Sequence, residues 1–163
     1  RSQKSGGGVC PIYPGHSYSF SDPVKYLEAY GRYDFALTHK KAGWDCFRHV
    51  EICFSGAIPY MPDAALIPQH TMVHYPKEVL VGVANHIQGK TAIALEALKS
   101  DFRDYFNRHL TSRAMASYLV RVAPFLGTGP VLFVDEAAVA MPDYQSVLTL
   151  IGLKQLLGKQ VSG

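Results

Sequence analysis

Apolar residues recur along this chain with two different spacings, which predict helices that alternate with short strands. Apolar positions at helical spacing occur in the segments 24–30, 45–54, 77–86, 91–99, 102–110, 112–122 and 146–157. Runs with strand character occur in the segments 33–38, 57–60, 71–75 and 131–134. Strands that alternate with helices favour an α/β layered domain with a mostly parallel sheet.

Local signals mark where several of these elements begin or end. Asp22 and Pro23 suit the cap and the first position of the first helix, because aspartate accepts hydrogen bonds from first-turn amides. Thr111 or Ser112 is expected to cap the helix that follows it. Pro59 has no amide hydrogen to donate, so its strand is expected to be an edge strand or to end there.

The length and composition indicate one globular domain. The chain has 163 residues, of which 48% are hydrophobic, and this is enough to form a core. We expect residues 1–22 to be a flexible lead-in and loop, and residues 23–163 to be a single Rossmann-like α/β domain. The chain stops just after a helix, where a further strand is expected, and this suggests a piece of a longer polypeptide.

Charge and cysteine content narrow the classes of function. The formal net charge of +3 is mild and spread along the chain, so we expect no nucleic-acid partner. No apolar run approaches the ~20 residues of a transmembrane helix, and the first residues lack the apolar core of a signal peptide. Cys46 and Cys53 lie in apolar helical pattern, so we expect buried, reduced thiols and a cytoplasmic location. Cys46 and His49 are too few ligands for a metal site, and none is expected.

The candidate chemistry lies in the segment 40–63, KKAGWDCFRHVEICFSGAIPYMPD. Lys40, Lys41, Gly43 and Trp44 form a loop between a predicted strand and a predicted helix. Cationic side chains and free amides at a helix N-terminus bind anions such as a diphosphate, and ligands of open α/β sheets lie at the carboxyl ends of the strands. The alternative is a solvated basic turn. Trp44 either packs in the core or stacks on a base or sugar.

Arg48 and Glu51 lie one helical turn apart in an otherwise apolar helix. They form either an intrahelical ion pair, worth ~0.2–0.5 kcal/mol, or contacts with a ligand, and the apolar surroundings favour the ligand. A carboxylate such as Glu51 accepts hydrogen bonds from sugar hydroxyls. Asp63 follows the next predicted strand, where it either reaches a ligand or caps a turn. The segment therefore predicts a site for phosphate and sugar.

A second segment suggests a different nucleotide site. Residues 84–91 read ANHIQGKT, a relaxed phosphate-loop pattern, and residues 131–136 read VLFVDE, an apolar strand that ends in two acids. A P-loop nucleotide hydrolase would use Lys90, Thr91, Asp135 and Glu136. The loop has no interior glycine, however, so the tight curvature that aims amides at phosphates is poorly supported.

The segment 40–63 resembles the donor-binding half of GT-B-type glycosyltransferases, particularly the exostosin-like branch. Those proteins carry an Arg-x-x-Glu helix, then a turn with glycine and an Ile-Pro strand, and here the pattern is RHVE at 48–51 followed by GAIP at 56–59. The segments GWDCFRHVE, GAIPYMPD and TMVHYPKE are similar to those of a subset of the family. The segment HLTSRAMASYL, at 109–119, is similar to the helix that follows the donor-binding half in those proteins. The similar, donor-binding part covers about 33–119.

The tail, 130–163, resembles the opening strand and helix of the N-terminal half of the same family. In those proteins that segment comes first, whereas here it follows the donor-binding part. Either two units follow one another and this strand-helix tail starts the second, or the tail completes the sheet of the donor domain.

The resemblance implies a Rossmann-like three-layer domain that transfers a sugar from a UDP- or GDP-linked donor to a glycan or other hydroxyl acceptor, without a metal or other cofactor. It also implies a second Rossmann-like half in the same polypeptide, and catalytic roles for Arg48 and Glu51. The implied donor-binding residues are Lys40, Lys41, Gly43, Trp44, Asp45, Arg48, Glu51 and Asp63. A non-catalytic Rossmann-like scaffold module is the remaining hypothesis.

Overall fold

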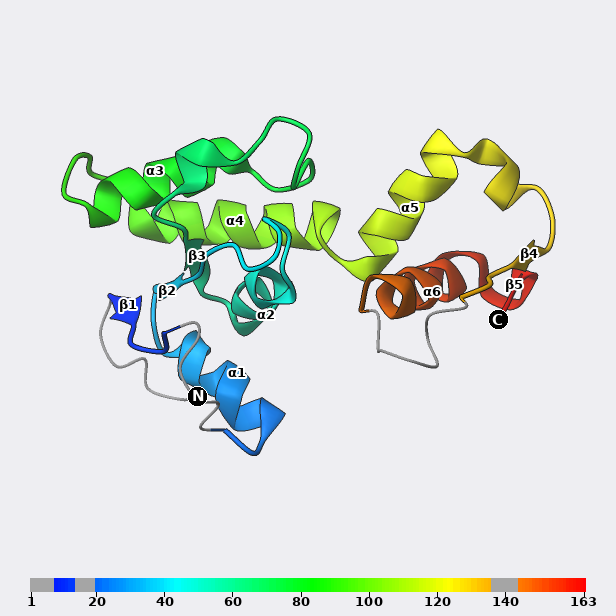
Figure 1. Cartoon of the computed structure of the whole chain (residues 1–163), viewed down its shortest axis with the longest axis horizontal. Coiled ribbons are helices and arrows are strands. Elements are labelled where there is room, and N and C mark those ends of the chain that lie inside the picture. Colours follow the sequence, from blue (N-terminus) through cyan, green and yellow to red (C-terminus); the bar gives the residue numbers. More distant parts are fainter. Residues whose placement is uncertain (1–7, 14–19, 136–143) are drawn as a thin grey trace. The chain divides into compact units, whose positions relative to one another are not determined.

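The computed structural model describes residues 8–13, 20–135 and 144–163. Within these residues the chain is an α/β structure, with helices and short parallel strands in two small sheets (Figure 1). It forms two compact units, Arg1–Asp104 and Tyr105–Gly163, which we call unit 1 and unit 2. The boundary between them differs from the expected end of the donor-binding part at residue 119. The single domain over 23–163 stays a prediction.

Unit 1 is built on a sheet of three parallel strands. They are β1 (Val9–Cys10), β2 (Phe35–Leu37) and β3 (Ile58–Tyr60), in the order β1-β2-β3. β1 lies within the segment 1–22, where the sequence predicted a lead-in and a loop and no strand. The strand forms because Cys10, which is 2% exposed, packs with the core, and such long-range packing leaves no local signal.

Two helices that pack against each other complete the core beside this sheet. α1 (Pro23–Gly31) begins as predicted, with the Asp22 carboxylate accepting a hydrogen bond from the Val24 amide at 2.8 Å. α2 (Phe47–Ser55) ends at Gly56, whose φ of 88° is the left-handed conformation that glycine adopts without strain. The buried cluster between these elements contains Cys10, Tyr26, Tyr30, Ala36, Ile52 and Ala57.

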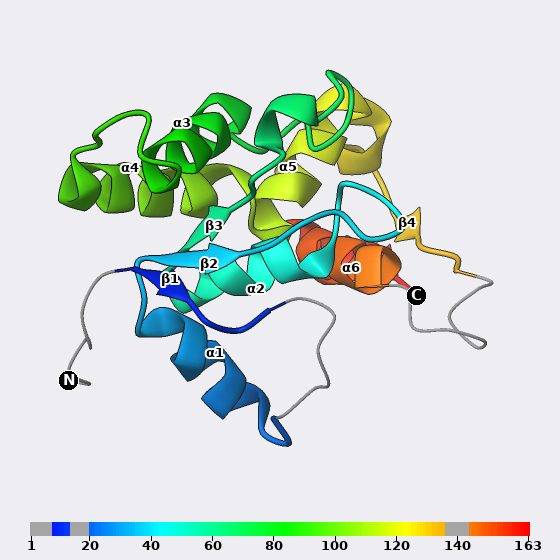
Figure 2. The same cartoon turned by 60° about the vertical axis from the view of Figure 1, so that its left-hand side comes forward.

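The next elements lie on the other side of the strands from α1 (Figures 1 and 2). A short 3-10 helix, η1 (Ala64–Leu66), follows β3, and α3 (Lys77–Ile87) packs on both η1 and β3. α4 (Leu95–His109) begins in unit 1 and crosses its boundary. Lys99 of α4 forms an ion pair with Asp34, just before β2, and both side chains are only 9% exposed. This pair fixes the start of α4 against the amino end of β2.

Unit 2 contains a helical pair and a two-stranded parallel sheet. α5 (Ser112–Val122) is capped by the Thr111 hydroxyl, as predicted, and packs on α6 (Tyr144–Leu157). β4 (Val131–Leu132) pairs with β5 (Val161–Ser162), and the short 3-10 helices η2 (Pro124–Gly127) and η3 (Gly158–Gln160) connect these elements. Ala116, Leu153 and Val161 are its buried cluster.

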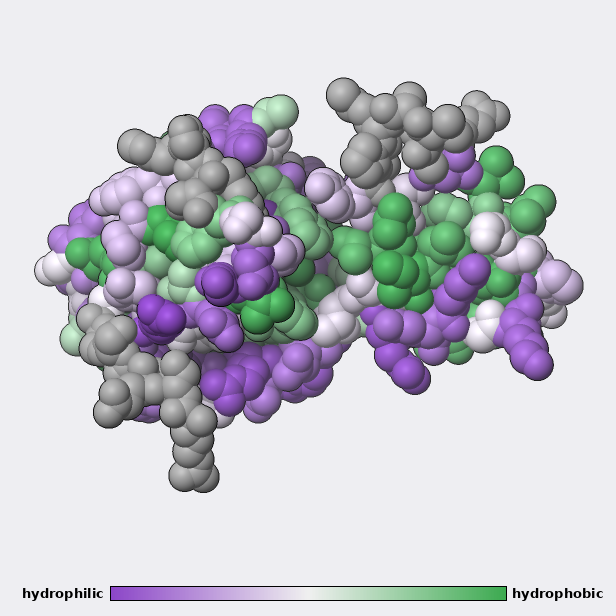
Figure 3. All heavy atoms as spheres, turned by 90° about the horizontal axis from the view of Figure 1, so that it is seen from below, coloured by the Kyte–Doolittle hydropathy of each residue, from purple (hydrophilic) through white to green (hydrophobic). Residues whose placement is uncertain are grey.

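The outer surface of unit 2 is partly apolar. On α6, Val147 and Ile151 are 47% and 42% exposed, and Figure 3 shows hydrophobic residues on the face of this unit that is turned to the viewer. α6 is therefore apolar on more of its circumference than α5 covers. Among the described residues, no helix is both long enough and apolar enough to cross a membrane.

Three predicted elements differ from the structure. The strand expected at 71–75 is a turn: the Tyr75 amide donates to the Met72 carbonyl at 3.0 Å, and Met72 has a φ of 51°. The helices expected at 91–99 and 102–110 are one helix, α4, which starts only at Leu95. The Rossmann-like three-layer architecture stays a prediction, because the described sheets have only three and two strands.

Candidate functional site

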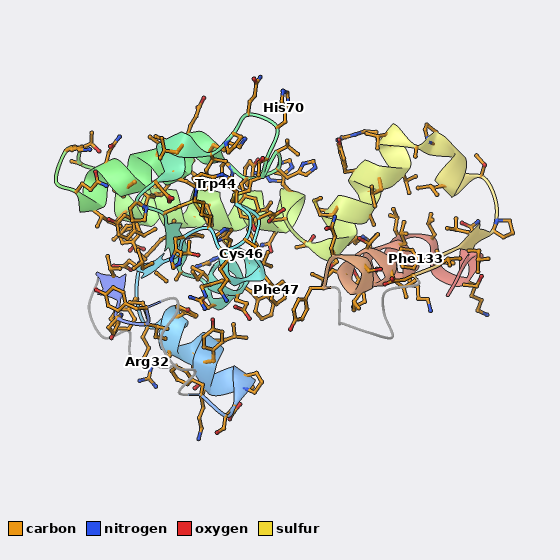
Figure 4. The ribbon with its side chains drawn as sticks, in the orientation of Figure 1. Arg32, Trp44, Cys46, Phe47, His70 and Phe133 are labelled. Atoms are coloured by element: carbon orange, nitrogen blue, oxygen red, sulfur yellow. The ribbon has the colours of Figure 1, made fainter. Side chains whose placement is uncertain are left out.

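The candidate site lies at the carboxyl ends of β2 and β3, in unit 1. Because the two strands are parallel, the loop 38–46 after β2 and the turn 61–63 after β3 leave the sheet at the same edge. α2 starts at the end of this loop, so its amino end also lies at this edge, where helix amides favour an anion. Figure 4 labels Trp44, Cys46 and Phe47 along the path from the loop into α2.

His49 holds this edge together. Its side chain is completely buried, with Nδ1 2.9 Å from the Thr38 hydroxyl and Nε2 2.8 Å from the Trp44 carbonyl. Since a carbonyl only accepts, Nε2 carries the proton and donates to Trp44, and Nδ1 accepts from Thr38. The ring thus ties the end of β2 to the basic loop.

Burial favours the neutral form of the imidazole. Burial lowers the pKa of His49, and the neighbouring Arg48 acts in the same direction, against the opposing effects of the Trp44 carbonyl, Asp45 and Asp63. Cys46 Sγ lies 3.4 Å from Nε2 and 3.6 Å from Nδ1, but each of these nitrogens has a closer oxygen partner, in the Trp44 carbonyl and the Thr38 hydroxyl. His49 therefore has a structural role and is not positioned as a general base for Cys46.

The basic loop presents its charged side chains to solvent. Lys40, Lys41 and Gly43 are exposed, and Lys40 Nζ lies 4.9 Å from the centre of the Trp44 ring. Trp44 is half-buried, so its ring neither fills the core nor stands free. Asp45, the last of the predicted binding residues in this loop, is exposed. The predicted loop residues are thus brought together at the amino end of α2.

Arg48 and Glu51 do not pair with each other. Glu51 Oε2 accepts a hydrogen bond from the Tyr26 hydroxyl of α1 at 3.1 Å, and that hydroxyl lies 3.2 Å from the Tyr30 hydroxyl. Arg48 Nη1 is buried and has no hydrogen-bond partner among the described residues. The intrahelical ion pair is therefore the wrong alternative. One oxygen of Glu51 therefore has a hydrogen-bond partner on α1, whereas Arg48 has a buried donor without a partner among the described residues.

Asp63 and Tyr75 also carry buried oxygens without a partner. Oδ1 of Asp63 is unpaired within the described part of the chain, and its side chain makes no cap hydrogen bond to η1. The capping role that the sequence left open is thus absent. The Tyr75 hydroxyl, in the turn before α3, is buried and unpaired as well. Tyr75 was not among the predicted site residues, because it lies in the segment predicted as a strand.

The alternative phosphate loop has the wrong backbone. Residues 84–87 are the last turn of α3, so the element that leads into them is a helix and not the strand that a phosphate loop follows. The amides of Gln88, Gly89 and Lys90 donate to carbonyls of that helix at 3.0, 2.9 and 2.8 Å, so these three are not free to bind phosphate. Lys90 and Thr91 precede the next helix by several residues. Asp135 follows β4 in unit 2, and Glu136 lies outside the described residues.

The cysteines and acidic groups add no further chemistry. Cys10, Cys46 and Cys53 are free thiols, and burial raises the pKa of both Cys10 and Cys53. Cys53 is buried as predicted, whereas Cys46 is half-buried. No group of three or more His, Cys, Asp or Glu side chains in the described residues is placed to hold a metal ion.

In comparisons with known proteins, no family model, no curated protein and no solved structure matches this chain. The resemblance to the exostosin-like branch therefore stays a prediction from the sequence.

Proposed function

We propose that unit 1 binds the nucleotide-sugar donor of a metal-independent GT-B-type glycosyltransferase. The observation that carries this proposal is the buried, unpaired Arg48 Nη1 in the first turn of α2, at the carboxyl edge of the sheet. A buried guanidinium donor without a partner is costly, and a phosphate oxygen supplies the charge and geometry that it lacks. The amino end of α2 favours the same anion.

Each predicted residue has a role in this proposal. Lys40, Lys41 and Arg48 surround the diphosphate and stabilise the charge that grows on it as the sugar leaves, which raises turnover as well as affinity. Glu51 uses the oxygen that Tyr26 leaves free to accept a hydrogen bond from a ribose or sugar hydroxyl. A glycan or other hydroxyl acceptor and its general base belong to the second Rossmann-like half that the resemblance implies.

Calorimetry of this chain with UDP and GDP tests the proposal. We expect binding of one of them without Mg²⁺, and a loss of about tenfold or more in affinity for Arg48→Gln, equal to ~1.4 kcal/mol per factor of ten. Arg32→Gln is the matched control, because Arg32 is an exposed arginine of the same unit, at the end of α1. Equal affinities for the two variants would refute the role of Arg48.

The same titrations separate the other hypotheses. A hydrolase would bind ATP or GTP only with Mg²⁺ and would lose this binding in Lys90→Ala, which the amide hydrogen bonds at 88–90 argue against. A scaffold module would bind none of the nucleotides. Glu51→Gln, which keeps the size of the side chain, is expected to weaken UDP or GDP binding less than Arg48→Gln, because one of its oxygens is already used by Tyr26.

A further inference from the structure

Three buried polar atoms of unit 1 have no partner in the described part of the chain: Arg48 Nη1, Asp63 Oδ1 and the Tyr75 hydroxyl. Each unpaired buried group costs about 1–3 kcal/mol, and charged groups cost more. No ion pair joins Arg48 to Asp63, although the charges of both act on the pKa of His49. Arg48, in the first turn of α2, and Asp63, just after β3, both lie at the carboxyl edge of the sheet.

Tyr75 lies next to His49. Its ring packs edge-on against His49, with ring centres 6.0 Å apart and planes at 82°. Its side chain is 9% exposed, and burial, with nearby Cys53, Asp45 and Cys46, raises the pKa of its hydroxyl. The hydroxyl therefore stays protonated, and the ring that carries it contacts α2 through His49. Packing alone needs only the ring, so the unpaired hydroxyl calls for a separate explanation.

The backbone around Tyr75 is fixed. Its amide donates to the Met72 carbonyl at 3.0 Å, and Lys77 Nζ donates to the carbonyls of Pro68 and Gln69, both at 2.8 Å. These contacts tie the segment 68–76 to the start of α3. The Tyr75 hydroxyl is consequently held in place before any ligand arrives, which limits the entropy that binding removes.

We propose that Asp63 and Tyr75 bind the hydroxyl groups of the transferred sugar, next to the diphosphate that Arg48 binds. This inference rests on the proposed function and deepens it. A carboxylate only accepts hydrogen bonds and repels phosphate, so the partner of Asp63 is a hydroxyl or another donor. A tyrosine hydroxyl both donates and accepts, as sugar hydroxyls do. Arg48, at the amino end of α2, is the group of the three that suits the diphosphate.

The inference predicts that the two parts of the donor depend on different residues. Arg48→Gln should lower the affinity for the nucleotide diphosphate and the affinity for the nucleotide sugar by similar factors. Asp63→Asn and Tyr75→Phe should leave the affinity for UDP or GDP within about twofold, and lower the affinity for the nucleotide sugar about tenfold, which is the usual range for a lost hydrogen bond to a ligand. A role in folding alone would change both affinities by the same factor.

The experiment is calorimetry of UDP and GDP beside UDP-glucose, UDP-galactose, UDP-N-acetylglucosamine, UDP-glucuronate, GDP-mannose and GDP-fucose. Tyr33→Phe is the matched control, because Tyr33 is a half-buried tyrosine of the same unit that precedes β2, at the opposite end of the strand from the site. Thermal unfolding of each variant without ligand is measured in parallel. Tyr75→Phe should unfold at the same or a higher temperature, since it removes an unpaired buried hydroxyl and keeps the ring.

The outcomes separate the two proposals. Selective loss of nucleotide-sugar affinity in Tyr75→Phe and Asp63→Asn supports the inference. Unchanged affinities in both variants, or equal losses of affinity for UDP and for the UDP-sugar, overturn the inference. The proposed function is still supported in that case if the unaltered chain binds the nucleotide. If the unaltered chain binds a nucleotide but no nucleotide sugar more tightly, the inference is also wrong. If the unaltered chain binds neither kind of ligand, both proposals fail.

Discussion

Replacing His49 by leucine removes the group that ties the basic loop to the end of β2. Leucine keeps apolar volume in a completely buried position, but it leaves the Thr38 hydroxyl and the Trp44 carbonyl without their hydrogen bonds of 2.9 and 2.8 Å. Each such loss costs about 1–3 kcal/mol when the group stays buried. Thr38 is fully buried and Trp44 is half-buried, so we expect a loss of about 2–4 kcal/mol in the free energy of unfolding.

The same residue predicts how stability depends on pH. Burial lowers the pKa of His49 from its ordinary value of 6.5, whereas the unfolded chain binds the proton near that value. The unfolded state therefore binds more protons below pH 6.5, and acid lowers stability. The contribution of His49 is complete above pH 6.5 and is lost as the pH falls towards its pKa in the folded chain. Between pH 7.5 and 5.5 this loss amounts to at most about 1.4 kcal/mol.

Urea denaturation at pH 7.5 and 5.5 measures both effects. Trp44, the single tryptophan of the chain, accepts the hydrogen bond from His49 and reports this edge by fluorescence, and circular dichroism reports the helices. We expect the unaltered chain to lose stability between the two pH values, and His49→Leu to lose less by up to about 1.4 kcal/mol. His70→Leu, at an exposed histidine, should behave like the unaltered chain. Identical pH dependence in all three would show that His49 is not held neutral.

Two further substitutions test the packing of each unit by urea denaturation. In unit 1, Lys99→Met should lower the free energy of unfolding by about 3–5 kcal/mol, because it leaves Asp34 buried without its partner, and adding Asp34→Asn should recover most of that loss. A loss below about 1 kcal/mol would mean that water solvates the Asp34 carboxylate once Lys99 is removed. In unit 2, Gly152→Ala places a methyl group 2.2 Å from the Ser112 carbonyl oxygen and should cost about 1–3 kcal/mol. Gly129→Ala, with nothing within 4 Å, should be nearly neutral; equal effects would contradict the close approach of α5 and α6.

The capping signals in this sequence are local, and the structure confirms two of them. Asp22 and Thr111 cap α1 and α5 as expected, since a cap depends only on a side chain and amides two or three residues away. Pro59 was expected at an edge strand, and β3 pairs only with β2 among the described strands. These features could be inferred because each one depends on a few neighbouring residues.

Pairing of strands is not local, and the predictions failed there. Segment 71–75 has aromatic and β-branched residues, but it pairs with none of the described strands, and Lys77 binds the carbonyls of Pro68 and Gln69 just before it. Conversely, β1 has little strand character, yet its pairing with β2 and the burial of Cys10 make it a strand. Strand propensity describes a fit to a partner surface, and the partner is not visible in a short window of sequence.

The site could be predicted only in part for the same reason. Lys40, Trp44 and Arg48 are neighbours in the chain, and the strand-loop-helix order was enough to place them at one edge. The partner that Glu51 actually has, Tyr26, is 25 residues away, on another helix. Tyr75 contacts the ring of His49 and so belongs to the site. It lies in a turn whose apolar residues led to the prediction of a strand.

The arrangement around His49 has a consequence for selectivity. The imidazole satisfies both of its nitrogens within the protein, so it offers nothing to a ligand and serves to position its neighbours. Arg48, Asp63 and Tyr75 are left with unused hydrogen-bonding capacity in a buried setting. A ligand that lacks a matching group would keep these atoms unpaired, and sites of this kind reject such ligands far more strongly than apolar pockets reject a missing methylene. Selectivity for an anion that carries hydroxyl groups would thus follow from the free-energy cost of these unpaired buried atoms, which is present before any ligand binds.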